Sequence, residues 1–374
     1  MNILFVTSSF QKLDNGPAKF AKILTELNSP GNSCHILTED IHESSEGIYF
    51  ANIHIPFWAK PFGFVYRMIP YYREVLKLMK SSMYDIIWFN NVIIGFWTAW
   101  KLRDSIGVVG MINDDNSIQT NFQNFRFSKK WFRHIIFRWF EKKSITVYRQ
   151  IVVNSSYLLN SVLTNYHFDP TKVQLLYKAV QGSDCLNEKY VHSYQGRILN
   201  VLFIKSDFMR GGLLDLLNAL SRLHTTFNLF IVGPPKDKLE SFLTDYNLRN
   251  VHITMTGLLR QDEIFKLMCS CDIFCIPSRQ EALGVANMEA LIHKLPVVYT
   301  EIGGVNEVMD DGRNGFAAKV SNPESLSISL LACIEQQHDR ILKVEQGYEF
   351  VSKKFNNDVM LHTFIKIARH AVNS

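Results

Sequence analysis

Short apolar runs alternate with amphipathic stretches along nearly the whole chain, in two successive series. The first series begins with NILFVTSS and AKFAKILTEL, and the second begins with RILNVLFIKS. Apolar runs of about four to eight residues are typical of buried strands, and the amphipathic stretches between them are typical of helices. This alternation predicts parallel sheets covered by helices. Apolar periodicity is lost over residues 181–197, so we predict two α/β domains, residues 1–180 and 181–354.

The remaining runs that we interpret as strands are YDIIWFNN, VVGMIND and QIVVNSS in the first series and LFIVGPP, VHITMTG, CDIFCIPS, LPVVYTE and FAAKV in the second. With 374 residues, 47% hydrophobic and 20% charged, the chain is long enough for two globular domains. Its longest apolar run, residues 86–100, is shorter than the ~20 residues of a membrane-spanning helix. The start, MNILFVTSSF, has no basic leader and no cleavage site, so we expect a cytoplasmic protein.

The segment PSRQEALGVANMEALIHKLPVV, residues 277–298, places carboxylates between a predicted strand and a predicted helix. Open α/β sheets bind ligands at this kind of strand end. Carboxylates such as Glu281 and Glu289 accept hydrogen bonds from vicinal hydroxyls, and backbone N–H groups at a helix start suit phosphate oxygens. Gly284 lets the backbone approach a diphosphate closely. The segment is therefore suited to a sugar joined to a phosphate.

An ordered set of residues extends this motif: Pro277, Ser278, Glu281, Gly284, Glu289, Ala290, LPVV, Gly303, Gly304, Glu307 and DGRNGF at 311–316. The set resembles the signature of the retaining glycosyltransferases of family four. GPAKFAKIL and LFIVGPP resemble that family more loosely. The resemblance implies a GT-B fold, in which two facing Rossmann-like domains have the active site in the cleft between them. It also implies that a final helix, residues 355–374, crosses back onto the first domain.

The resemblance also assigns the donor, a nucleotide-diphosphate sugar. Glu281 would contact the hydroxyls of the transferred sugar and Glu289 the ribose. The other donor-binding residues that it implies are Gly16, Gly233, Leu258, Leu283, Gly284 and Val285. The family's two basic residues for the diphosphate correspond to Lys205 and Arg210 in FIKSDFMRGGLLDLL, although their spacing differs from the common one.

We predict that Glu281, Lys205 and Arg210 are the catalytic residues. A nucleoside diphosphate leaves as an anion, so stabilising its developing charge lowers the barrier more than an acid would. The glutamates are occupied by substrate hydroxyls and are not the acid and nucleophile of a glycosidase. We expect neither a metal nor a cofactor, because cations and helix dipoles already face the phosphates.

The first domain departs from the family on the acceptor side. Asn113 and Asp114, in MINDDNS, stand where the family has a His-Asp pair, and LLYKAVQ at 175–181 replaces an Asn-Gly-Val-Asp. Asparagine cannot take a proton, and the resemblance implies that the leaving phosphate accepts the acceptor's proton. We therefore keep Asn113 and Asp114 as acceptor-side residues.

Residues 121–150 combine positive charge with aromatic side chains. They contain eight Lys or Arg against the single Glu141, and nine aromatic residues. A helical wheel places Trp131, Phe132, Ile135, Ile136, Trp139 and Phe140 on one side and Arg133, His134 and Arg138 on the other. This pattern fits peripheral contact with the inner face of the cell membrane, and it also fits a helix packed on its own domain with a solvated basic face. A similar mixture at 56–80 favours the membrane.

Three of the six cysteines, Cys269, Cys271 and Cys275, lie close together, and we interpret them as small core residues and not as a metal site. We expect no nucleic-acid partner, because no known nucleic-acid module surrounds the basic helix.

The predicted activity is sugar transfer from the nucleotide donor to a glycan or lipid-linked acceptor. A catalytically silent relative that acts as a scaffold and a nucleotide-sugar epimerase remain alternatives. A dehydrogenase is disfavoured because no GxGxxG follows a predicted strand.

Overall fold

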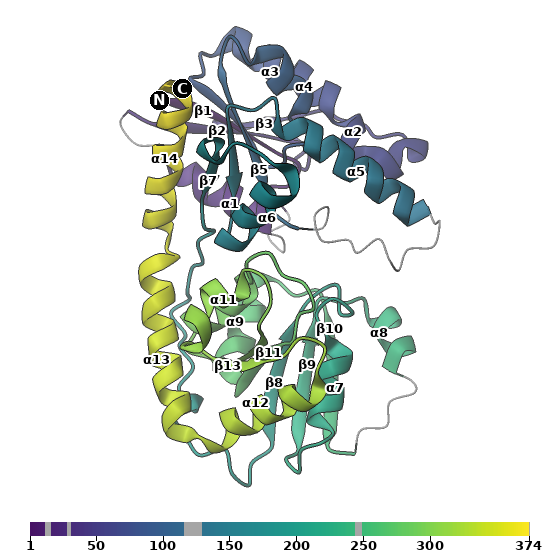
Figure 1. The fold of residues 1–374 in the computed structure, drawn as a ribbon, viewed down its shortest axis with the longest axis vertical. Coiled ribbons are helices and arrows are strands. Elements are labelled where there is room, and N and C mark those ends of the chain that lie inside the picture. Colours follow the sequence, from purple (N-terminus) through teal and green to yellow (C-terminus); the bar gives the residue numbers. More distant parts are fainter. Residues whose placement is uncertain (12–15, 28–30, 116–128, 244–248, 374) are drawn as a thin grey trace. The chain divides into compact units, whose positions relative to one another are not determined.

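The computed structural model describes residues 1–11, 16–27, 31–115, 129–243 and 249–373. The chain forms two compact units. The first consists of Met1–Lys178 together with Asp358–Ser374, and the second consists of Ala179–Asn357. Each unit is a parallel sheet with helices packed against it, which confirms the predicted α/β class (Figure 1).

In its described residues, the first unit contains a seven-stranded sheet in the order β3-β2-β1-β4-β5-β6-β7. The strands are β1 (Asn2–Thr7), β2 (Ser33–Thr38), β3 (Ile48–Phe50), β4 (Ile86–Phe89), β5 (Gly107–Ile112), β6 (Gln150–Val153) and β7 (Val173–Leu175). The sequence pattern missed β2, β3 and β7. Polar residues interrupt β2, and β3 and β7 have three residues each, so none of them forms a continuous apolar run.

The helices of the first unit are α1 (Gly16–Leu24), α2 (Gly63–Tyr66), α3 (Met68–Ser81), α4 (Phe96–Leu102), α5 (Lys129–Ile145), α6 (Ser156–Tyr166) and α14 (Asn357–Asn373), with short 3₁₀ turns at η1 (Thr25–Leu27), η2 (Phe57–Phe62) and η4 (Pro170–Lys172). Local chemistry sets the ends of α6. The side chain of Ser155 accepts a hydrogen bond from the N–H of Leu158 at 3.0 Å, which caps the first turn. His167 ends the helix in a left-handed conformation with φ of 50°.

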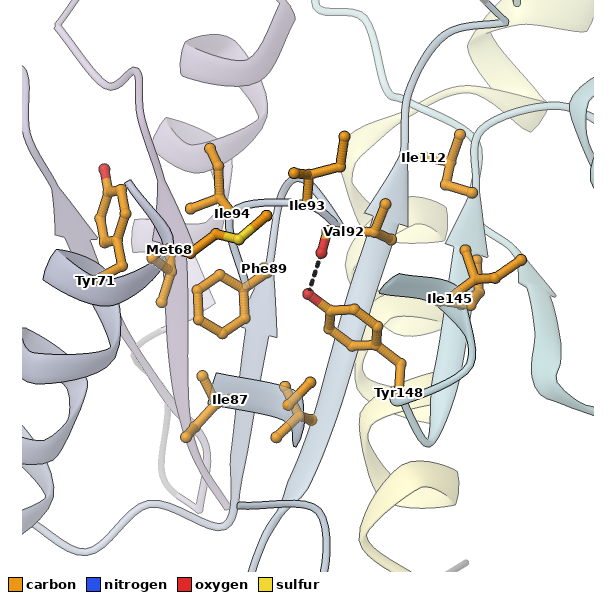
Figure 2. Close-up of a cluster of buried hydrophobic side chains, with 14 of the residues drawn as sticks. Met68, Tyr71, Ile87, Phe89, Val92, Ile93, Ile94, Ile112, Ile145 and Tyr148 are labelled. Atoms are coloured by element: carbon orange, nitrogen blue, oxygen red, sulfur yellow. Dashed lines mark hydrogen bonds between the residues drawn. The ribbon is translucent and has the colours of Figure 1, made fainter. Parts of the chain in front are cut away.

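Helix α3 packs on the sheet through residues three and four positions apart. Met68, Tyr71 and Val75 are buried on this face. Figure 2 shows Met68 and Tyr71 beside Phe89 of β4, within the core of the unit. The hydroxyl of Tyr148 donates to the backbone oxygen of Val92 at 2.6 Å, so the polar end of this buried ring is satisfied (Figure 2).

Helix α14 packs on the sheet of the first unit, although it is last in the chain (Figure 1). Phe364 on this helix lies 4.2 Å from the ring of Trp88 on β4, measured between ring centroids. The rings of Phe5 and Phe20 also contact Phe364. A fully buried aromatic cluster therefore fixes the C-terminal helix to the first unit.

In its described residues, the second unit contains a six-stranded sheet in the order β10-β9-β8-β11-β12-β13. The strands are β8 (Leu199–Ile204), β9 (Phe227–Val232), β10 (Val251–Gly257), β11 (Ile273–Ile276), β12 (Val297–Thr300) and β13 (Phe316–Ala318). The helices are α7 (Leu213–Leu220), α8 (Lys236–Leu243), α9 (Gln261–Ser270), α10 (Val285–Ile292), α11 (Val305–Val308), α12 (Pro323–Glu335) and α13 (Gln337–Lys354), with 3₁₀ turns η5 (Lys189–Val191) and η6 (Asp310–Gly312). Strand β8 pairs with both β9 and β11. The order of strands reverses there, and open α/β sheets bind their ligands at such a switch point.

Candidate active site

Two loops meet at the switch point of the second unit. One joins β8 to α7 and the other joins β11 to α10. Gly212 lies in the first loop with φ of 73°, and a Cβ added there would be 2.1 Å from the backbone oxygen of Pro277 in the second. Glycine at position 212 therefore allows the two loops to touch.

The predicted cation Lys205 and the predicted carboxylate Glu281 come together at these loops. The Nζ of Lys205 donates to Oε2 of Glu281, and both side chains are partly exposed. The hydroxyl of Ser278 lies 3.5 Å from the same oxygen. The backbone oxygen of Ser278 accepts a hydrogen bond from Thr300 on β12 at 2.5 Å, which holds the start of the loop. A carboxylate and an ammonium group thus face one another at the strand ends.

The second predicted cation, Arg210, lies in the β8–α7 loop. Its backbone oxygen accepts a hydrogen bond from the N–H of Arg279 at 2.8 Å, and its own N–H donates to Asp207 at 3.1 Å. The Nε of Arg210 is buried and has no hydrogen-bond partner in the part of the chain that the structure describes. A buried donor of this kind is available to an anionic ligand.

An ion pair that the sequence reasoning missed joins the same two elements. Arg279 donates from Nε and Nη2 to the two carboxylate oxygens of Asp215 on α7, each at 3.0 Å. These hydrogen bonds raise the pKa of the Arg279 guanidinium. Arg279 lies inside the PSRQEALG motif, but Asp215 is 64 positions away and nothing local marks it as its partner. The pair anchors the loop that presents Glu281.

Gly284 starts helix α10 in a left-handed conformation, with φ of 90°. The first N–H groups of a helix have no partner inside it, so they are available to phosphate oxygens. Leu283 is buried beneath this turn, and Val285 is the first residue of the helix. Gly304 lies against the turn, because a Cβ there would be 2.1 Å from the backbone oxygen of Ala282. Leu283, Gly284 and Val285 thus lie together at the start of α10.

Glu289 lies one turn into α10 and is 7% exposed. Its Oε1 accepts a hydrogen bond from Nε2 of Gln261, at the start of α9, at 3.3 Å. Gln261 was not predicted, since a glutamine after a loop has no distinctive sequence signal. Leu258 follows β10 and is 66% exposed. Gly233 follows β9 with φ of 111°, and its N–H donates to Gly257 at 2.8 Å.

The acceptor-side residues lie in the first unit, as does Gly16 at the start of α1. Asn113 follows β5, and its Nδ2 donates to the backbone oxygen of Asn90, after β4, at 2.7 Å. Asn154, after β6, donates to the backbone oxygen of Asn113 at 2.9 Å, and Asn90 donates to Thr7 at the end of β1 at 3.3 Å. Side chains at four adjacent strand ends are therefore linked. The repeated asparagine after apolar runs was a signal that the sequence reasoning did not use.

Asp114 is exposed, whereas the next residue, Asp115, is buried. The hydroxyl of Tyr157 on α6 donates to Oδ2 of Asp115 at 2.9 Å. Burial and this carboxylate raise the pKa of Tyr157 to about 12. Asp115 therefore holds α6 to the strand ends, and Asp114 is the aspartate that remains accessible.

The described side chains of helix α5 begin at Phe132, and Trp131 of the predicted wheel lies outside them. Phe132 and Trp139 are 57% and 56% exposed, whereas Phe140 packs against the core with Phe137. Lys142 and Lys143 are exposed and line a recess together with Trp139. Phe132 and Trp139 belong to the aromatic side of the wheel, so that side does not pack wholly on the domain, as the alternative with only a solvated basic face requires. Residues 121–128 lie outside the described part of the chain.

The prediction that Cys269, Cys271 and Cys275 are core residues is confirmed for two of the three. Cys271 and Cys275 are buried free cysteines, and burial raises the pKa of both thiols. Cys269 is instead joined by a disulfide to Cys185, which is 84 positions earlier. Cys269 is therefore not the core residue that was expected, because it lies near the end of α9, where it is only half-buried.

Two family models match the sequence. Residues 199–336 match the family described as glycosyl transferases group 1, and residues 21–181 match glycosyltransferase family 4. The chain belongs to the group 1 glycosyltransferases. An uncharacterised glycosyltransferase of Methanocaldococcus jannaschii is 26% identical over 322 residues, covering 86% of this chain and 85% of the relative. The O-antigen chain mannosyltransferase RfbU of Salmonella typhimurium is 20% identical over 333 residues, covering 85% and 87%.

Solved structures confirm the GT-B fold. Sucrose-phosphate synthase from Thermosynechococcus elongatus aligns with a TM-score of 0.81 at 15% identity, covering 99% of this glycosyltransferase and 98% of that chain. Anabaena HepE in complex with UDP-glucose aligns with a TM-score of 0.73 at 16% identity, covering 99% and 100%.

Among the described residues, no helix has the length and apolar character needed to cross a membrane.

Proposed function

We propose that this glycosyltransferase moves a sugar from a nucleotide-diphosphate sugar to a hydroxyl group and retains the anomeric configuration. The observation that carries the proposal is the meeting of Lys205 and Glu281 at the switch point, beside the helix start at Gly284. A nucleotide-diphosphate sugar carries hydroxyls at one end of its reactive bond and negative phosphate oxygens at the other. The site offers a carboxylate for the first and positive groups for the second.

Each predicted side chain has a defined task in this proposal. Glu281 accepts hydrogen bonds from the transferred sugar, and binding exchanges its contact with Lys205 for contacts with substrate. Lys205 and Arg210 then face the diphosphate together with the N–H groups at the start of α10. Glu289 accepts hydrogen bonds from the ribose, with Gln261 beside it. The uncompensated Nε of Arg210 supports its assignment to the phosphates.

The proposed step breaks the bond between the anomeric carbon and the phosphate oxygen. The electron pair leaves with the nucleoside diphosphate, and the positive groups stabilise the charge as it develops. The acceptor oxygen forms a new bond to the anomeric carbon on the same face, and its proton passes to the leaving phosphate. No side chain acts as the base, which agrees with an asparagine at position 113.

We infer that the acceptor belongs to surface polysaccharide or glycolipid assembly. RfbU is named for the O-antigen chain, and the solved structure of WaaG is titled as a glycosyltransferase involved in lipopolysaccharide biosynthesis. HepE was solved with UDP-glucose and with UDP, which supports a nucleotide sugar as the donor.

The purified protein should be incubated with labelled UDP-, GDP- and ADP-sugars, with and without oligosaccharide acceptors. We expect slow donor hydrolysis or transfer with one donor, and an NMR spectrum of the product that shows the anomeric configuration of that donor. Lys205→Ala and Glu281→Gln should each reduce turnover by about tenfold or more, since each loses a charge-assisted contact. Lys238→Ala, which removes an exposed lysine on α8, is the matched control.

Other outcomes would contradict the proposal in different ways. An epimerised donor would make the protein an epimerase. No binding of any nucleotide sugar would make it a silent relative. An inverted product would overturn retention alone.

We also propose peripheral membrane contact through a basic aromatic surface on α5, defined as Phe132, Arg133, Trp139, Lys142 and Lys143. All five side chains are exposed. Exposed aromatic rings with lysines beside them suit the headgroup region of an anionic bilayer, where each basic residue contributes about 1 kcal/mol.

Helix α2 and the turn before it extend the same side of the first unit. The ring of Phe64 on α2 lies 5.1 Å from that of Phe137 on α5, so the two helices are neighbours (Figure 1). Phe57 of η2 is 84% exposed, and the Nζ of Lys60 lies 5.1 Å from the centre of its ring. These groups repeat the combination found on α5, which supports a common membrane-facing role.

Flotation with vesicles of phosphatidylglycerol and phosphatidylcholine tests this contact. Wild type should float with the anionic vesicles, and a Trp139→Ser, Lys142→Gln, Lys143→Gln variant should remain at the bottom. Met83→Ser removes an apolar side chain that is 89% exposed outside this surface, and should float like wild type. Equal flotation of all three proteins would exclude the basic aromatic surface as the contact.

A further inference from the structure

A recess of about 670 Å³ lies at the carboxyl ends of β1 and β2 in the first unit. Its polar lining consists of Ser8, Ser9, Glu39, Asp40 and Arg67, and Pro17 and two isoleucines complete the wall. The volume falls in the range of small-molecule sites, and the mostly polar lining suits a ligand that carries many hydrogen-bonding groups. No predicted site residue lines it.

The arginine of the recess is already neutralised. Both Nε and Nη2 of Arg67 contact the same oxygen, Oε1 of Glu39, each at 2.6 Å. The side chain of Arg67 is 26% exposed and that of Glu39 is 11% exposed, so the pair is shielded from water. This ion pair offsets the charge of the guanidinium and so reduces its attraction for a phosphate.

The second oxygen of the Glu39 carboxylate takes no part in the ion pair. Its Oε2 is buried and has no hydrogen-bond partner among the described residues. A buried carboxylate oxygen without a donor is unfavourable, so a ligand that supplies an O–H group would be bound there. The recess thus offers an acceptor atom and lacks a free cation among the side chains that line it.

Asp40 gives the recess its shape and a further negative charge. Its carboxylate accepts hydrogen bonds from the backbone N–H of Phe10 at 2.8 Å and of Gln11 at 3.1 Å. The hydroxyl of Thr38 donates to it at 3.0 Å. These contacts hold the loop after β1 against the end of β2. With Arg67 paired to Glu39, Asp40 leaves the recess with a net negative charge, which repels phosphate.

We propose that this recess binds an uncharged, hydroxyl-rich sugar of the acceptor, and that the Glu39–Arg67 pair excludes phosphorylated sugars from it. The inference rests on the proposed function, since it names the class of acceptor for the same reaction. Hydroxyls of the sugar donate to Oε2 of Glu39 and contact the serines after β1, while its apolar face lies on the isoleucines.

Saturation-transfer NMR on the full-length protein tests the inference without any donor. The probes are the methyl glycosides of glucose, galactose and mannose, each beside the corresponding sugar 6-phosphate. In wild type we expect signal from at least one methyl glycoside and none from the phosphates. The proposal would be overturned if wild type bound the sugar 6-phosphates as strongly as the methyl glycosides, or if it bound no methyl glycoside at all. Neither result needs a variant.

Glu39→Gln should reverse the preference, because it removes the charge that neutralises Arg67. We expect the 6-phosphates to bind about tenfold or more tightly than to wild type. Adding Arg67→Gln should abolish this gain, which would identify the guanidinium as its source. Glu43→Gln makes the same change of charge at an exposed position of the following loop and should leave both preferences unchanged. If Glu39→Gln behaves like Glu43→Gln, the pair does not control the ligand.

The experiments distinguish a failure of the recess proposal from a failure of the proposed glycosyltransferase reaction. Donor turnover together with phosphate binding to the wild-type recess would reject the acceptor class and leave the glycosyltransferase reaction intact. Methyl glycoside binding without turnover of any nucleotide sugar would reject the proposed reaction and leave the recess as a sugar site.

Discussion

Gly212 provides a sharp test of whether contact between the two loops makes the donor site. In Gly212→Ala, the new Cβ would stand 2.1 Å from the backbone oxygen of Pro277. Real Cβ atoms essentially never approach a heavy atom within 3.0 Å, and here the neighbour is backbone that cannot rotate away. The β8–α7 and β11–α10 loops must therefore separate by about 1 Å, a displacement that can reduce catalysis by about 100-fold.

Gly196→Ala is the matched control. Gly196 has φ of 70°, nearly the same as 73° at Gly212, but a Cβ there meets nothing within 4 Å. Both variants bear the strain of a left-handed alanine, about 1–2 kcal/mol. In a unit of this size that strain lowers the melting temperature by roughly 2–8 °C. The difference between the variants isolates the contact with Pro277.

Donor turnover and thermal unfolding should be measured for both variants. We expect Gly196→Ala to keep wild-type kcat/KM with a modestly lower melting temperature. Gly212→Ala should lose about 100-fold in kcat/KM and melt lower still. If the two variants show the same turnover, separation of the loops does not matter to the donor, and the site as described is wrong.

Three further predictions concern stability. Arg279→Ala should destabilise the second unit by about 3 kcal/mol in urea unfolding, because it leaves the buried carboxylate of Asp215 unpaired. Asp215→Ala should cost less, since the Arg279 side chain is 37% exposed and can be solvated by water. A larger loss of stability for Asp215→Ala than for Arg279→Ala would contradict the anchoring role. Burial lowers the pKa of His293 below its ordinary 6.5, so the unfolded state binds more protons than the folded state, and wild type should lose stability as pH falls below about 6.5. In His293→Gln, the melting temperature should depend less on pH in this range. An equal pH dependence in wild type and variant would show that His293 does not cause the loss. Tyr148→Phe should cost about 1 kcal/mol in denaturant unfolding, because the backbone oxygen of Val92 loses its donor, and an unchanged free energy would show that water replaces it.

Much of the second unit was predictable because its strands are continuous apolar runs. Strand β11, residues Ile273–Ile276, is fully buried, and its apolar side chains are adjacent in sequence. The motif around Glu281 and Glu289 then follows from strand–loop–helix geometry, which is set by neighbours along the chain. In the first unit, β2 and β3 were missed because half-buried positions occur in both, so neither is a continuous buried apolar run.

The α/β class, the two series of strands and the loops that carry the motif could be inferred from the residues alone, since periodicity reports which local segments are buried. The pairings of Arg279 with Asp215 and of Arg67 with Glu39, and the outward direction of Trp139, are evident only in the folded chain. Such pairs join residues tens of positions apart, and they form because parallel strands end at one edge of a sheet. Which charged groups meet there depends on strand order and helix orientation, and neither can be predicted from local composition.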